Sequence, residues 1–173
     1  HTVRVFSLCD TDGFRPFLDQ AGIPVIIGHK RGGADVRLIR LLRATLLETG
    51  VDGVHTHNFV PSYYAAAATR FARRPPVLVN TCHNMGGRLR NRRLRWLYRW
   101  SLAYAQKVAM VGSQVREQLV SSRRVPAAKS STVMNGIPVD RFERSSDTRA
   151  QVRDELGIAQ EALVVGTVGR LVE

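Results

Sequence analysis

Long hydrophobic runs are missing from this sequence of 173 residues. No stretch approaches the roughly 18 consecutive apolar residues that a membrane-spanning helix requires, and no basic segment followed by an apolar one opens the chain at His1. The composition, 44% hydrophobic and 23% charged, is typical of a globular domain and argues against disorder or a fibrous repeat. The length suits one domain with a full core.

Cysteine is scarce as well. Cys9 and Cys82 each follow an apolar run and have no CxxC spacing, so neither a disulfide framework nor a zinc site is expected. Two such cysteines fit a reducing compartment best, and the cytoplasm is the expected location.

Acidic residues are absent from a long central segment. Between Asp52 and Glu117 there is no Asp or Glu, while ten arginines and one lysine supply +11 of charge. A GC-rich coding sequence would explain the excess of arginine (23) over lysine (3), but it does not explain the missing acids. Segregated positive charge favours an anionic partner: a phosphate group, a nucleic acid or an acidic membrane surface.

Several catalytic signatures are also lacking. The sequence has no Walker A motif, no GxGxxG between a strand and a helix, and no GxSxG. These absences argue against a P-loop nucleotidase, a typical dinucleotide-binding enzyme and a Ser-His-Asp hydrolase.

What the sequence does contain is a regular alternation of strand-like and helical segments. Strands are predicted at 2–8, 25–27, 51–57, 76–81, 107–111 and 131–134, and helices at 14–21, 35–49, 61–73, 94–105 and onward from Ser113. Strands that alternate with helices of ten or more residues indicate βαβ units. Right-handed crossovers then favour an α/β fold with a doubly wound, Rossmann-like parallel sheet.

The pattern changes after Met134. Residues 135–144 (NGIPVDRFER) are rich in turn formers, a helix is predicted near 148–156, and an apolar segment at 162–168 is predicted to be a strand. A lone strand at a terminus has no partner unless it begins a further sheet, so we expect it to open a second domain.

Apolar and basic residues segregate on the predicted helix 94–105. The apolar and small members share one stripe: Leu94, Leu97, Tyr98, Ser101, Leu102 and Ala105. The opposite face carries three arginines and a tryptophan: Arg92, Arg95, Trp96 and Arg99. Arginines beside a tryptophan suit an anionic membrane surface, and the alternative is a solvated helix on which the indole lies flat.

Histidines stand where two predicted strands end, in HTHN (55–58) and in HN (83–84). Ligands of doubly wound sheets bind outside the carboxyl ends of the strands. His55 and His57 point to the same face of their strand, but a metal site is disfavoured because no carboxylate occurs from Gly53 to Arg116. We expect a buried, hydrogen-bonded His55 and a His57 that faces the cleft.

The order of HTHN, TCHN, NGIPVDRF and VGRL resembles the retaining nucleotide-sugar glycosyltransferases of family 4, which have the GT-B fold. The resemblance covers essentially the whole chain, and NGIPVDRF followed by VGRL is its most specific part. In that family two Rossmann-like domains face each other, the first holding mainly the acceptor and the second mainly the sugar nucleotide.

The resemblance implies a domain plan that is truncated at both ends. Residues 1–142 would be the N-terminal, acceptor-side domain without its first strand, 143–161 an interdomain connector and helix, and 162–173 the first strand of a donor-binding C-terminal domain. This fragment alone is expected to be inactive.

The resemblance also implies catalytic roles. His83 would position the donor sugar, and Gly169 and Arg170 would bind the donor phosphates, where a guanidinium stabilises the charge that develops on the leaving group. A packed histidine that caps the following segment is the alternative for His83. No cofactor and no metal is then required.

Other positions would hold the acceptor or link the domains. The acceptor cleft is assigned His57, Asn58 and Asn84, and the interdomain connector Asn135 and Gly136. The partners implied are a nucleotide sugar, an acceptor glycan or lipid-linked sugar, and an anionic membrane surface.

The expected function is sugar transfer in glycan or glycolipid synthesis of the cell envelope, at the inner face of the membrane. Two alternatives stay open: a basic nucleic-acid-binding α/β module, and a sugar-nucleotide epimerase of the same fold. The sequence has no helix-turn-helix, RNP or zinc pattern, which argues against the nucleic-acid-binding module, so nucleic acid is not an expected partner.

Overall fold

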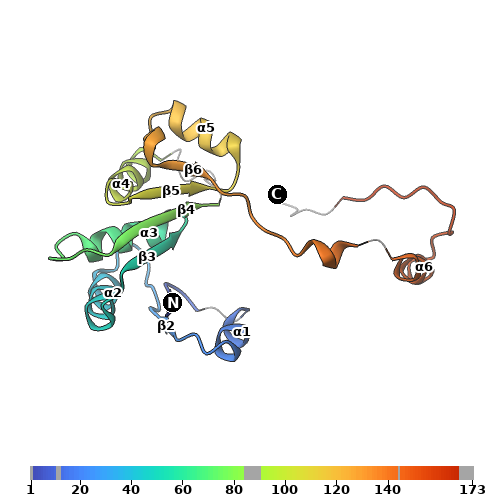
Figure 1. The fold of residues 1–173 in the computed structure, drawn as a ribbon, viewed down its shortest axis with the longest axis horizontal. Helices are drawn as coiled ribbons and strands as arrows, with labels where there is room; N and C mark the ends of the chain where they lie inside the picture. The colour runs from blue at the N-terminus through green and yellow to red at the C-terminus, as the bar shows by residue number, and fades with distance from the viewer. Residues whose placement is uncertain (1, 11–12, 84–90, 144, 168–173) are drawn as a thin grey trace. The chain divides into compact units, whose positions relative to one another are not determined.

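The computed structural model describes residues 2–10, 13–83, 91–143 and 145–167 (Figure 1). The chain divides into two compact units between Asn135 and Gly136. The sequence placed the end of the first domain somewhat later, after residue 142.

The first unit alternates strands and helices in the predicted order. Its elements are β1 Val5–Ser7, α1 Arg15–Gln20, β2 Val25–Ile27, α2 Val36–Thr49, β3 Gly53–His57, α3 Phe59–Thr69, β4 Val77–Cys82, α4 Arg92–Ala103, β5 Lys107–Met110, α5 Ser113–Ser121, the 3-10 helix η2 Ala127–Lys129 and β6 Ser130–Thr132. Every strand pair in the described part of the chain is parallel, which confirms the predicted α/β class.

The strands form two sheets rather than one. β1 pairs with β2, and β3, β4, β5 and β6 form a four-stranded sheet in that order. No backbone ladder joins β1 to β3 among the residues described, but helix packing ties the two sheets together. Leu38 and Leu42 of α2 form a small core with Tyr64 and Ala68 of α3, against which Phe6 of β1 packs.

The crossover helices of the four-stranded sheet share one face. β3 to β6 follow one another both in sequence and across the sheet, so right-handed crossovers place α3, α4 and α5 on the same side. The main core lies between these helices and the sheet, where Leu78, Val108 and Met110 of the strands are buried. The small side chains of Ala65 and Ala66 let α3 lie close to the strands.

The ends of α2 follow the sequence signals. Oδ1 of Asp35 accepts a hydrogen bond from the Leu38 N–H at 3.2 Å, and Gly50 ends the helix with a left-handed φ of 57°. A further bond from the Arg31 N–H, at 3.1 Å, is the main cause that lowers the pKa of Asp35.

The second unit contains the 3-10 helix η3 Val139–Phe142 and the helix α6 Ser146–Glu155. The predicted helix near 148–156 is therefore confirmed, and Ser145 caps it by accepting the Thr148 N–H at 3.2 Å. The predicted strand at 162–168 is wrong for the residues described, because 162–167 belong to no strand. Leu163 and Val165 are exposed there, and an extended segment becomes a strand only beside a hydrogen-bonded partner.

Candidate active site

The ends of β3 and β4 bring two histidines together. The parallel register pairs His57, the last residue of β3, with Thr81 of β4, so the two strands end at the same edge of the sheet. His83 follows the last residue of β4, and its Nε2 lies 2.9 Å from Nδ1 of His57. One ring must donate and the other accept, and the tautomers decide which.

His55 extends the cluster along β3. Its Nε2 lies 2.7 Å from Oγ1 of Thr81, and its ring centroid lies 4.4 Å from that of His57. The hydrogen bond agrees with the sequence expectation, but His55 is exposed rather than buried. Side chains alternate along a strand, so Thr56 points into the core under the helices while its two histidine neighbours point away from it.

The surroundings of His57 favour its neutral form. Desolvation, and then the nearby His55 and His83, lower the pKa of His57 below its usual value. At neutral pH His57 is therefore uncharged, with one ring nitrogen that donates and one that accepts.

Asn58 holds the backbone of His83 in place. Its Oδ1 accepts the His83 N–H at 3.1 Å, and its own N–H donates to the carbonyl of Thr81 at 2.7 Å. Asn58 stands immediately before α3 with φ 63° and ψ −167°, a backbone region that residues other than glycine seldom adopt. A strained residue that directly follows one strand and hydrogen-bonds to the end of the next is typical of a functional site.

A buried polar network, which was not predicted from the sequence, lies beneath this edge. The Asn80 side chain donates to Oγ1 of Thr56 at 3.0 Å and to the carbonyl of Asn58 at 2.8 Å, while its Oδ1 accepts the Tyr98 hydroxyl at 2.9 Å. Burial raises the pKa of Tyr98, so its hydroxyl stays protonated and donates. The signal for this network was an asparagine within the apolar run VLVNTC, because such a residue, once buried, needs partners.

The other predicted site residues are distributed differently. Asn84, Gly169 and Arg170 lie outside the described residues. Asn135 and Gly136, assigned to the connector, are exposed and stand where the chain divides.

Within the part of the chain that is described, no three His, Cys, Asp or Glu side chains form a group that could hold a metal ion, and no helix is long and apolar enough to cross a membrane.

The predicted division of α4 into two faces is confirmed. Tyr98, Ser101 and Leu102 are buried. The opposite face lines a hollow of about 360 Å³, which the residues after α5 complete. The hollow is lined by Arg92, Arg95, Trp96, Arg99, Ser122, Arg123 and Arg124. Arg123 and Arg124 were not predicted from the sequence to belong to this face.

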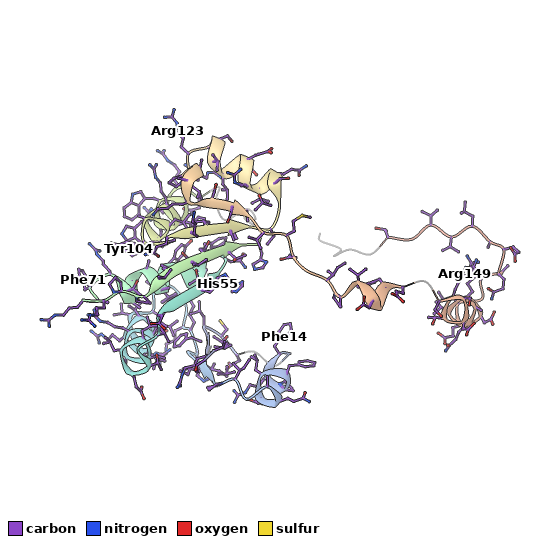
Figure 2. All side chains as sticks on the ribbon, viewed as in Figure 1. Phe14, His55, Phe71, Tyr104, Arg123 and Arg149 are labelled. Carbon is purple, nitrogen blue, oxygen red and sulfur yellow. The ribbon has the colours of Figure 1, made fainter. Side chains whose placement is uncertain are left out.

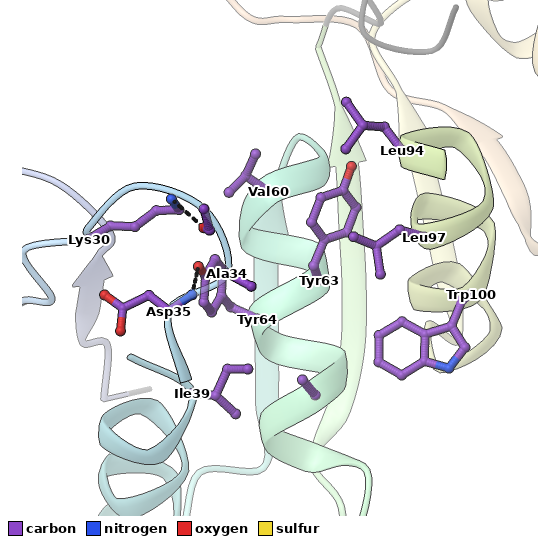
Figure 3. Close-up of a pocket in the computed structure, with 12 residues that line it drawn as sticks. Lys30, Ala34, Asp35, Ile39, Val60, Tyr63, Tyr64, Leu94, Leu97 and Trp100 are labelled. Carbon is purple, nitrogen blue, oxygen red and sulfur yellow. Dashed lines mark hydrogen bonds between the residues drawn. The ribbon is translucent and has the colours of Figure 1, made fainter. Parts of the chain in front are cut away.

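An apolar groove of about 540 Å³ runs along α3, between α2 and α4 (Figure 3). Figure 3 shows Ile39 on its α2 side, Tyr63 on α3, and Leu97 and Trp100 on α4. The Tyr64 hydroxyl accepts the Asp35 N–H at 3.1 Å and so joins α3 to the start of α2.

Comparisons with known proteins agree with this architecture. HepE of Anabaena, crystallised with UDP, is similar to the chain with a TM-score of 0.71 and 19% identity, and the match covers 89% of this chain and 42% of HepE. A glycosyltransferase from Rickettsia africae ESF-5 has a TM-score of 0.71 and 17% identity, over 93% of this chain and 42% of its own. At these identities the likeness shows the fold, and the chain spans less than half the length of either protein.

No curated protein matches the chain. The family model of glycosyltransferase family 4 matches residues 1–141, which include the six described strands, the histidine cluster and the arginine hollow. The chain therefore belongs to glycosyltransferase family 4.

Proposed function

We propose that the complete protein transfers a sugar from a nucleotide sugar to an acceptor hydroxyl, with retention of the anomeric configuration. The observation that carries this proposal is the pairing of His57 with His83 beside Asn58, at the strand ends where open α/β sheets bind ligands. Family membership supports transferase chemistry. HepE has been crystallised with UDP and with UDP-glucose, so UDP-sugars are the first donors to test.

The cluster suggests a role for each residue. Nε2 of His83 is engaged by His57, so we assign the contact with the donor sugar to the other ring nitrogen of His83. His57 and Asn58 hold that ring and its backbone in position. We assign these two residues, together with Asn84, to the acceptor cleft. A preorganised group of this kind accelerates transfer by orienting the reactants.

We assign the stabilisation of the negative charge on the departing diphosphate to Gly169 and Arg170. A guanidinium and backbone N–H groups can stabilise that charge, so the proposed mechanism requires no metal ion. Asn135 and Gly136 would link this half to a donor-binding domain.

The acceptor is proposed to be lipid-linked, as in envelope glycan or glycolipid synthesis. The apolar groove begins at Val60 and Leu94, in the first turns of α3 and α4, and these helices follow the carboxyl ends of β3 and β4. Arg92, Arg95, Trp96 and Arg99 would hold the protein on the anionic inner face of a membrane. The free cysteines, Cys9 and Cys82, fit a cytoplasmic location.

The test is a transfer assay on the complete protein with isotopically labelled UDP-sugars and two acceptor pools, a lipid extract and a water-soluble glycan fraction. We expect label in the lipid fraction, and NMR of the product should show the anomeric configuration of the donor. An inverted product would contradict retention. Label only in soluble glycans would contradict the lipid-linked acceptor, and no transfer from any sugar nucleotide would contradict the function.

A further inference from the structure

The arginine hollow is a feature separate from the histidine cluster. Its walls come from α4 and from the turn after α5, whereas His55 and His57 point away from the helix layer. Figure 2 shows Arg123 projecting outward beside α5, well apart from His55 on β3. The proposed transfer reaction gives this hollow no chemical role.

Three of the four arginines of α4 form one continuous strip. Arg92, Arg95 and Arg99 follow the spacing i, i+3, i+7, which keeps them on one helical face over about 10 Å at 1.5 Å per residue. Trp96 stands among them with 68% of its surface exposed. The strip therefore combines three fixed positive charges with an exposed indole.

The turn after α5 brings in two more arginines. The Arg123 N–H donates to the carbonyl of Val120 at 2.9 Å, and the Arg124 N–H donates to that of Leu119 at 2.9 Å. Arg123 has a left-handed φ of 52°, a conformation that usually selects glycine at the end of a helix. This reversal of the chain lets two consecutive side chains line the same hollow.

The five guanidinium groups have no acidic partner in the described residues. The ion pairs found there involve Arg15, His29 and Arg37, all outside the hollow. Like charges gathered around one concavity repel one another and attract an anion to it. An anionic ligand would therefore stabilise this arrangement.

We infer that the hollow binds the phosphate monoester headgroup of an anionic membrane lipid. A monoester carries a charge near −2 and presents three terminal oxygens, which suit several guanidinium groups better than a phosphodiester does. The exposed indole of Trp96 suits the boundary between headgroups and water. The choice of a lipid rests on the membrane association proposed above, but the inference does not depend on the transfer reaction.

The experiment measures binding of the complete protein to vesicles without any sugar nucleotide. Vesicles of phosphatidic acid in neutral lipid are compared with vesicles of phosphatidylglycerol whose surface charge has been matched. We expect the wild-type protein to bind the monoester lipid about tenfold more tightly at equal surface charge. The Arg123→Gly/Arg124→Gln variant should lose that preference, and glycine suits the left-handed position, so the turn should survive.

The matched control is Arg73→Gln/Arg74→Gln, which removes two exposed arginines outside the hollow. It should weaken binding to both vesicle types equally and keep the preference. Equal binding of the wild type to both vesicles, or equal effects of the two double variants, would show diffuse attraction and overturn the site. Binding of free glycerol 3-phosphate as tight as that of the vesicles, or a preference for DNA that depends on Arg123, would overturn the lipid assignment.

Discussion

Nδ1 of His57 lies 2.9 Å from Nε2 of His83, so one imidazole donates to the other across the ends of β3 and β4. The contact joins residues 26 positions apart in the sequence. It makes the orientation of each ring depend on the other and gives the proposed active site its geometry.

Replacing His83 tests that geometry. His83→Ala in the complete protein should lower kcat for sugar transfer by about ten- to a thousandfold, the loss expected when a positioning hydrogen bond is removed from a preorganised site. The protein should still fold. His29→Asn is the control, because His29 is an exposed histidine that pairs with Asp10. Wild-type turnover by His83→Ala would mean that His83 is only a packed histidine.

The protonation of His57 should be visible in the pH dependence of stability. Its folded pKa is lowered, first by desolvation and then by the neighbouring histidines, so the unfolded chain binds a proton more readily. The resulting stabilisation is fully present above the unfolded pKa of about 6.5 and is lost as the pH falls through the folded pKa. Urea unfolding at several pH values should show this loss for the wild type and a smaller one for His57→Gln. An NMR titration that places His57 at or above 6.5 would contradict the assignment.

Asn58 allows backbone strain to be separated from function. Asn58→Gly and Asn58→Ala both remove the acceptor for the His83 N–H, but only glycine adopts φ 63° and ψ −167° without strain. We expect the glycine variant to be more stable than the alanine variant by about 1 to 3 kcal/mol in urea unfolding. Transfer activity should fall in both. Equal stability would show that the Asn58 backbone stores no strain.

Replacing Tyr98 tests how much the buried polar network contributes to the stability of the fold. Tyr98→Phe leaves Oδ1 of the buried Asn80 without its donor, at a cost of about 1 to 3 kcal/mol in the free energy of unfolding. Tyr104→Phe is the matched control, since the Tyr104 hydroxyl makes no hydrogen bond to a described residue and its removal should change stability little. Equal effects of the two substitutions in thermal unfolding would show that the hydrogen bond between Tyr98 and Asn80 does not stabilise the fold.

Most of the secondary structure follows from local signals. Asp35 and Gly50 bound α2 because a side-chain cap and a left-handed glycine act within one turn of the helix. The start of α3 was predicted at Pro61 but lies at Phe59, because a proline is tolerated within the first turn and need not mark its first residue. The apolar segment 162–168 was predicted to be the first strand of a further sheet, and its described residues, 162–167, form no strand because they have no strand partner in the described part of the chain.

The sequence by itself determined the α/β class, the positions of the histidines at strand ends and the two faces of α4, because each depends on spacing along one element. Only the tertiary structure decided that His57 meets His83, that Asn80 links Thr56 to Tyr98, and that Arg123 and Arg124 complete the hollow of α4. These contacts join residues that lie far apart in the chain. They depend on strand register and on the direction in which a turn sends the chain, and no local pattern of residues specifies either.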